Sequence, residues 1–100
     1  MARVLVSSPA NTDSNEILAY LARVAGRAAS DKYEALFNDV YDRLAVHPDM
    51  YEARPKLGPK IRAAVVWPYL VVYEHTTPDL VNVLRILHGS RRIGPSFLYS

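Results

Sequence analysis

The chain has 100 residues, of which 50% are hydrophobic and 22% are charged, a balance typical of one globular domain over residues 1–100 rather than a disordered chain. It contains no cysteine, which excludes a disulfide framework, a thiolate metal site and a cysteine nucleophile. No apolar run reaches the length of a membrane span, and the N-terminus has too few apolar residues for a signal peptide, so a cytoplasmic location is expected.

The net charge of +2 conceals an asymmetry between the two halves of the chain. Residues 1–53 hold five Lys or Arg and eight Asp or Glu, whereas residues 54–100 hold seven and two. A basic half suggests an acidic partner, either nucleic acid or an acidic peptide. The alternative is that the strands predicted there simply contain few acidic residues.

The N-terminal half predicts one strand and two helices. Residues 1–7 are predicted as the strand, because their apolar run is rich in Val. Helices are predicted within residues 9–46, with Ser8 as the first N-cap and Pro9 at the first helical position. Asp13, near this helix start, suits the helix dipole.

Both helices show an apolar stripe at helical spacing, and Gly26 interrupts the pattern between them. The first stripe consists of Ile17, Leu21 and Val24, and the second of Tyr33, Leu36, Phe37, Val40 and Leu44. His47-Pro48 ends the second helix, because the residue before a proline is pushed out of the helical region.

The C-terminal half predicts strands after a loop. Residues 48–60 contain three prolines and a glycine and are predicted as an ordered loop. Three β-branched and aromatic segments follow within residues 61–87, and their short connections indicate an antiparallel three-strand meander. Residues 88–100 form a basic tail. The order of elements predicts an α+β fold, with a helical hairpin packed on a mostly antiparallel sheet.

Motifs of catalysis and metal binding are missing from the sequence. The glycines are scattered, no G-x-S-x-G is present, and the three histidines have no metal-ligand spacing, so no catalytic residue, metal or cofactor is predicted. Basic and aromatic side chains of the C-terminal half could instead grip RNA, or serve a metal-free ribonuclease. Packing of these aromatic residues within the sheet is the simpler reading.

The order and spacing of several short motifs resemble the ParE family of toxins from bacterial toxin–antitoxin systems. The motifs are Ser8-Pro9, His47-Pro48, Arg54-Pro55, Leu57-Gly58, Tyr69-Leu70-Val71-Val72-Tyr73, and Val83 to Gly89 followed by Arg91. The resemblance covers nearly the whole chain. It implies the RelE/ParE fold, a twisted antiparallel sheet with a helical hairpin. It also implies a toxin that arrests growth until its antitoxin binds.

The same resemblance distinguishes two branches of the superfamily. RelE-like members cleave mRNA in the ribosome with basic residues on the strands, but the positions that match hold Ile61, Ala63 and Leu70. Arg91 can match an arginine of the nuclease set, whereas Phe97 stands where a tyrosine is needed. The departures favour the ParE-like branch, which is associated with poisoning of DNA gyrase and not with catalysis.

The resemblance implies two partners, a ParD-like antitoxin in a hetero-oligomer and DNA gyrase. The residues expected to contact the target are Arg85, His88, Arg91 and Arg92, with nucleic acid touched only indirectly, through gyrase-bound DNA. The residues expected to contact the antitoxin are Tyr33, Phe37, Tyr51, Arg54 and Pro55. The alternatives are a RelE-like ribosome-dependent nuclease and an inactive member that only binds partners.

Overall fold

The computed structural model describes residues 1–89 of the protein. Its elements, in chain order, are β1 (Arg3–Val6), α1 (Ser8–Ala25), α2 (Arg27–Val46), β2 (Glu52–Ala53), β3 (Ile61–Val66), β4 (Tyr69–Thr77) and β5 (Leu80–His88). The predicted α+β architecture is confirmed. The segment predicted as loop, residues 48–60, also contains the short strand β2, and most of the predicted basic tail lies outside the described residues.

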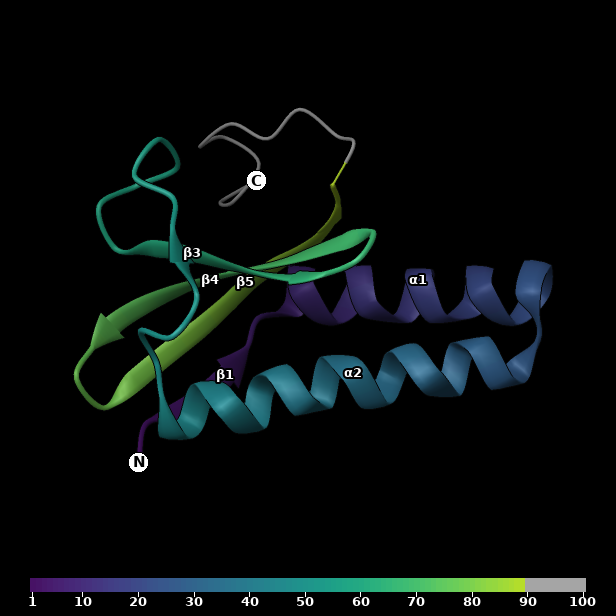
Figure 1. The fold of residues 1–100 in the computed structure, drawn as a ribbon, viewed down its shortest axis with the longest axis horizontal. Helices are drawn as coiled ribbons and strands as arrows, with labels where there is room; N and C mark the ends of the chain where they lie inside the picture. Colours follow the sequence, from purple (N-terminus) through teal and green to yellow (C-terminus); the bar gives the residue numbers. More distant parts are fainter. Residues whose placement is uncertain (90–100) are drawn as a thin grey trace.

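The five strands form one sheet in the order β1-β5-β4-β3-β2. β3, β4 and β5 are antiparallel neighbours, as the predicted meander requires, while β1 pairs in parallel with the first half of β5, from Arg3 opposite Leu80 to Val6 opposite Val83. The two helices lie side by side against the sheet, and the end of the hairpin where they meet extends beyond the strands (Figure 1).

The first helix begins one residue earlier than the sequence pattern predicts. Ser7, and not Ser8, is the N-cap, and its hydroxyl accepts a hydrogen bond from the amide of Ala10 at 3.2 Å. The same hydroxyl donates to the carbonyl of Leu84 at 3.0 Å, and the Ser7 amide donates to the carbonyl of Val83 at 3.0 Å. A contact with a distant strand therefore decides which of the two adjacent serines caps the helix.

The helices turn back on each other at Gly26, whose φ of +95° lies where side chains are rarely tolerated. A hydrogen bond of 2.9 Å from the Ser30 hydroxyl to the carbonyl of Leu18 ties the second helix to the first. Gly26 is thus needed for its backbone conformation, since a Cβ there would meet no other atom within 4 Å.

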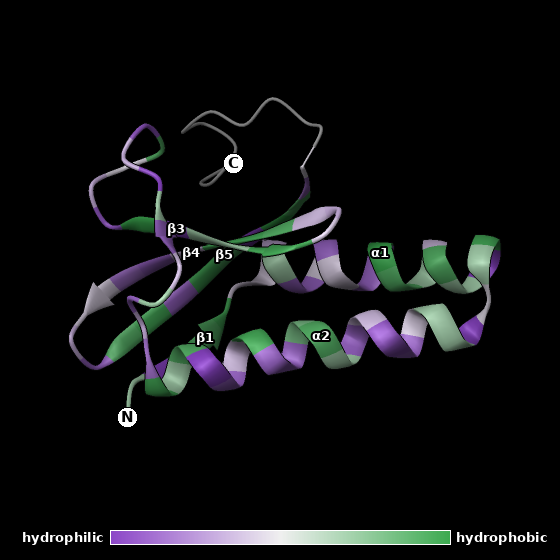
Figure 2. Ribbon diagram, viewed as in Figure 1, coloured by the Kyte–Doolittle hydropathy of each residue, from purple (hydrophilic) through white to green (hydrophobic). Residues whose placement is uncertain are grey.

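The main core lies between the helices and one face of the sheet. Its largest fully buried side chains include Phe37 and Leu44 from α2, Val71 and Tyr73 from β4, and Val83 from β5. In Figure 2 the strands β3 to β5 are largely hydrophobic, whereas the helices alternate between hydrophobic and hydrophilic bands. This banding is the pattern expected of helices with one apolar face.

A second, smaller apolar cluster lies on the opposite face of the sheet. Ile61, Ala63 and Val72 are buried there, and Leu57, Leu70 and Leu84 pack against them. Strand residues alternate between faces, so this cluster contains the residues that do not face the helices. Both faces of β3 and β4 are therefore apolar, although the helices cover only one.

The edge of β5 beyond the end of β1 is covered by the start of α1. Asp13 Oδ2 accepts hydrogen bonds from the amide of Ile86 at 3.0 Å and from Arg85 Nε at 2.7 Å, while its Oδ1 accepts from Arg85 Nη2 at 3.0 Å. The two side chains are only 12% and 15% exposed. These hydrogen bonds raise the pKa of Arg85 above its ordinary value. Asp13 thus binds the sheet, a role that the helix-dipole interpretation did not predict.

Replacement of Asp13 by alanine should destabilise the fold strongly. The variant leaves the Arg85 guanidinium buried without its carboxylate and the Ile86 amide without its acceptor, which predicts a loss of about 3 kcal/mol in the free energy of unfolding. Urea denaturation measures this loss. The control is Asp31→Ala at an exposed position of α2, for which a change within about 0.5 kcal/mol is expected. Equal effects of the two variants would contradict this role.

Candidate functional site

Strand side chains fix the connector between α2 and β3, residues 47–60, to the sheet. Arg62 Nη1 donates to the carbonyls of Asp49 and Tyr51, at 3.1 and 2.8 Å. Its Nε lies 3.4 Å from Asp49 Oδ1, and His75 Nδ1 lies 2.7 Å from the same oxygen. The first half of the connector is therefore positioned by β3 and β4 and not by its own sequence.

Tyr73 anchors the same segment from inside the core. Its hydroxyl donates to the carbonyl of Pro48 at 2.7 Å, and its ring meets that of Tyr51 edge-on, with centroids 6.3 Å apart. Burial raises the pKa of Tyr73 to about 12, against the smaller lowering effect of Arg62. Tyr73 therefore stays a neutral hydrogen-bond donor at all physiological pH values.

The second half of the connector folds into a closed loop. The Arg54 amide donates to the carbonyl of Ile61 at 2.8 Å, and the Leu57 amide donates to the carbonyl of Arg54 at 2.9 Å. Gly58 lets the loop pass close to β3, because a Cβ there would lie 2.9 Å from Ile61 Cγ1. The loop thus holds Arg54 and Leu57 over the sheet face that the helices leave uncovered.

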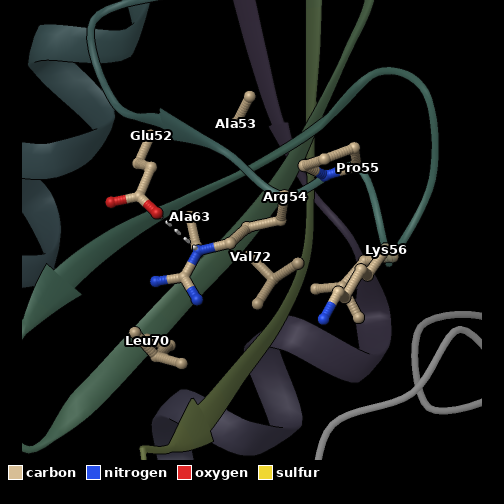
Figure 3. Close-up of a pocket in the computed structure, with 9 residues that line it drawn as sticks. Glu52, Ala53, Arg54, Pro55, Lys56, Ala63, Leu70 and Val72 are labelled. Carbon is tan, nitrogen blue, oxygen red and sulfur yellow. Dashed lines mark ion pairs between the residues drawn. The ribbon is translucent and has the colours of Figure 1, made fainter.

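A pocket of about 310 Å³ lies between this loop and the sheet. Its floor consists of the apolar side chains of Ala63, Leu70 and Val72, and its rim consists of residues 52–57 (Figure 3). The charged side chains of the lining, Glu52, Arg54 and Lys56, all come from the rim. The pocket therefore combines an apolar floor with a rim that carries one net positive charge.

Arg54 is the polar group of this pocket with unused hydrogen-bonding capacity. Its Nε is buried and has no hydrogen-bond partner among residues 1–89, although it forms a long ion pair with Glu52 Oε1 at 3.9 Å (Figure 3). A buried donor without an acceptor costs free energy, and a guanidinium fits a carboxylate in a bidentate geometry. The pocket can thus take an apolar side chain on its floor beside a carboxylate on Arg54.

The pocket occupies the sheet positions where RelE-like nucleases are expected to carry basic residues. Ala63 and Leu70 form its floor, and Ile61 is buried in the cluster beneath the loop. These side chains offer neither a positive charge for a phosphate nor a group that transfers protons. The floor is chemically suited to apolar contact.

The structure separates the five residues expected to contact the antitoxin. Arg54 and Pro55 line the pocket. Tyr33 and Tyr51 line a different hollow, between α2 and the edge of β3. Phe37 is only 1% exposed and belongs to the core, so it offers no surface to a partner. Tyr33 and Phe37 share one helical stripe, and its spacing alone could not tell which of them is covered by the sheet.

The residues expected to contact the target are also divided. Arg85 is held by Asp13 at the start of α1, which makes it part of the fold. His88 is exposed at the end of β5, with its ring edge-on to that of Tyr69 at 5.8 Å. Arg91 and Arg92 lie outside the described residues.

Sequence reasoning missed the floor of the pocket as a site. In the sequence, Leu70 and Val72 are part of an apolar run that is typical of a buried strand. Such a run does not show that one face of the strand lacks a covering layer. Within residues 1–89, no group of three or more His, Asp or Glu side chains is placed to hold a metal ion. No helix of this part of the chain is long and apolar enough to cross a membrane.

Comparisons with known proteins agree with the fold. The model of the family described as "ParE toxin of type II toxin-antitoxin system, parDE" matches residues 4–93. No curated protein matches the chain. Among solved structures, the chain is similar to the chromosomal ParDE TA system from P. aeruginosa, with a TM-score of 0.72 over 88% of this chain and 96% of that chain. At 18% sequence identity, this similarity shows the fold alone.

The burial of Tyr73 predicts an unusual alkaline titration. Because its pKa is about 12 in the folded protein and about 10 when unfolded, its contribution to stability is complete below pH 10. The contribution disappears between about pH 10 and 12 and amounts to about 3 kcal/mol. Phenolate absorbance should show that Tyr73→Phe removes a titration step near pH 12. Persistence of that step in the Tyr73→Phe variant would contradict the assignment.

Proposed function

The chain belongs to the ParE family of toxins of type II toxin–antitoxin systems, and from this membership we propose that a ParD-like antitoxin neutralises it and that it inhibits DNA gyrase. Both partners act in the cytoplasm, where the toxin–antitoxin complex would form a hetero-oligomer. The observation that carries the proposal is the pocket under the connector, with its apolar floor and the Nε of Arg54, which lacks a hydrogen-bond partner in the described part of the chain.

The pocket supports an antitoxin whose docking segment is both acidic and apolar. An apolar side chain of that segment would cover Ala63, Leu70 and Val72, and a neighbouring carboxylate would accept from Arg54. Residues 54–100 hold more basic than acidic residues. Their positive charge would attract an acidic segment before contact and increase the rate of association. Pro55 lies on the rim beside Arg54 and would contact the same segment.

Inhibition of gyrase by binding, without catalysis, is supported by the apolar character of the pocket floor. A ribosome-dependent nuclease would need charge at these positions. We propose that His88, together with Arg91 and Arg92, contacts the target, and that Arg85 acts indirectly by holding α1 against β5. This assignment leaves the rim of the pocket to the antitoxin.

Substitution of Arg54 should weaken the antitoxin complex. Arg54→Ala removes a donor to a charged acceptor, so the dissociation constant should rise about tenfold to a hundredfold. Arg54→Lys keeps the charge but loses the bidentate geometry and should lie in between. The toxin is co-expressed with the antitoxin encoded beside it, and calorimetry on the purified proteins gives the affinities. Arg27→Ala, at an exposed position of α2, should bind as the wild type does.

The target is tested on toxin released from its antitoxin. Induction should arrest growth, and the purified toxin should inhibit supercoiling or trap the cleavage complex of DNA gyrase. Each alternative function would give a different result. Normal growth after induction would indicate an inactive member. Discrete cuts in mRNA on primer extension would indicate a nuclease, and an unaffected gyrase at concentrations that stop growth would exclude gyrase as the target.

A further inference from the structure

The end of the helical hairpin contributes little to the packed core. Figure 1 shows α1 and α2 continuing side by side beyond the strands before they meet. Leu21 is the last side chain of α1 that packs with the main core, and Tyr33 is the first of α2. Every residue from 22 to 28 is exposed. This hairpin tip, residues 20–28, therefore projects from the fold without adding much burial to it.

The hairpin tip is nevertheless held in one shape. The Ser30 hydroxyl donates to the carbonyl of Leu18 at 2.9 Å and ties the two helices together just below the turn. The Ser30 amide donates to the carbonyl of Gly26, which closes the turn, at 3.3 Å. A surface that is fixed before binding loses little conformational entropy when a partner docks. The tip is therefore suited to present its side chains to a partner.

The exposed surface of the tip is largely apolar. Tyr20 and Val24 are 51% and 55% exposed, and their spacing of four residues places them on one side of α1. Ala22, Ala25 and Ala28 are exposed as well. In Figure 2 the hydrophobic bands of α1 continue to this end of the hairpin. Single exposed apolar side chains are ordinary, whereas neighbouring ones are typical of a contact site.

Both charged side chains of the tip are positive. They are Arg23 and Arg27, and the guanidinium carbon of Arg23 lies 5.6 Å from the centre of the Tyr20 ring. Asp31 follows Arg27 at the spacing that allows helical ion pairs. In the described part of the chain, however, no ion pair joins either arginine to another residue. The tip thus offers two cations beside an apolar patch.

We propose that the hairpin tip binds the protein that the toxin inhibits. Tyr20 and Val24 would pack on an apolar patch of that protein, and the two arginines would pair with its carboxylates. The inference rests on the proposed function, because it assumes that the toxin acts by binding a protein target. It adds a second contact to the one proposed for His88.

The composition of the tip favours an acidic protein over nucleic acid or a second copy of the chain. Interfaces with DNA are much more positively charged than interfaces between proteins, whereas most exposed side chains of the tip are apolar. Tyrosine and arginine are enriched at the centres of protein interfaces. A second copy docked tip to tip would bring the arginines of both copies together, which like-charge repulsion disfavours.

The tip lies far from the pocket proposed for the antitoxin. The connector and the tip lie toward opposite ends of the longest axis of the molecule (Figure 1). Substitutions in the tip should therefore leave the affinity for the antitoxin unchanged. This expectation separates a loss of target binding from a loss of folding, because an unfolded toxin would bind neither partner.

The test uses the full-length toxin, released from its antitoxin, with purified DNA gyrase as the probe. Tyr20→Ala should raise the dissociation constant by at least about tenfold, as expected of a central aromatic residue. Arg23→Glu and Arg27→Glu, each alone, should lower the association rate about threefold to tenfold and reduce its dependence on salt. Surface plasmon resonance at two salt concentrations measures these effects, and induction in cells measures growth arrest.

The opposite end of α2 supplies matched controls. Val46 is 51% exposed, so Val46→Ser is compared with Val24→Ser. Arg43 is exposed on the same helix as Arg27, so their replacements by glutamate are compared. Only the tip variants should bind gyrase more weakly and arrest growth less. Circular dichroism and an unchanged urea midpoint show that each variant is folded.

The outcomes separate this inference from the proposed function. Tip variants that inhibit gyrase as the wild type does would overturn the role of the tip alone. Growth arrest with gyrase unaffected and mRNA intact would exclude gyrase as the target. In that case, loss of arrest in the tip variants would support the tip, and full arrest would overturn it.

Absence of arrest by the wild type, or arrest with cut mRNA, would overturn both. Light scattering tests the remaining occupant of the surface. Self-association of the wild type that Tyr20→Ala abolishes would show that a second copy covers the tip, and would overturn the inference.

Discussion

The contact between Asp13 and β5 fixes where the helical layer begins on the sheet, while the apolar core packs the two layers together. β1 ends at Val6, but β5 continues to His88, so half of the β5 edge would face solvent without another partner. The carboxylate of Asp13 covers it by accepting from the Ile86 amide and the Arg85 guanidinium. This contact fixes the start of α1 against the sheet, and the position of the whole hairpin follows from it, because α2 is tied to α1.

The opposite end of the sheet is built differently, and the apolar pocket and the hollow beside α2 lie there. No helix start covers the edge of β3 in the described part of the chain, and only the short β2 pairs with it. The connector that carries β2 forms the rim of the apolar pocket and contributes Tyr51 to the hollow between α2 and the edge of β3. One segment, held by Arg62 and Tyr73, thus shapes both the pocket and the hollow.

Sequence patterns predicted the elements well and the surfaces poorly. The helices, the meander and their order were correct, because apolar periodicity and proline or glycine positions are local signals. The sequence predicted Ser8 as the N-cap, but the structure has Ser7. Both serines have suitable side chains, and the hydrogen bond from Ser7 to the Leu84 carbonyl decides between them. Phe37 and Tyr33 show the same limit, because a helical stripe indicates an apolar face without showing how far the sheet covers it.

The sequence by itself determined the α+β class, the helical hairpin, the antiparallel meander and the resemblance to the ParE toxins, all of which depend on neighbouring residues or on motif order. Only the tertiary structure decided that β1 runs parallel to β5, that Arg85 belongs to the fold, and that Arg54 lies beside an apolar floor with no hydrogen-bond partner for its Nε within residues 1–89. The physical reason is that burial and hydrogen bonding of these groups depend on residues up to 77 positions apart, and no local pattern records such pairings.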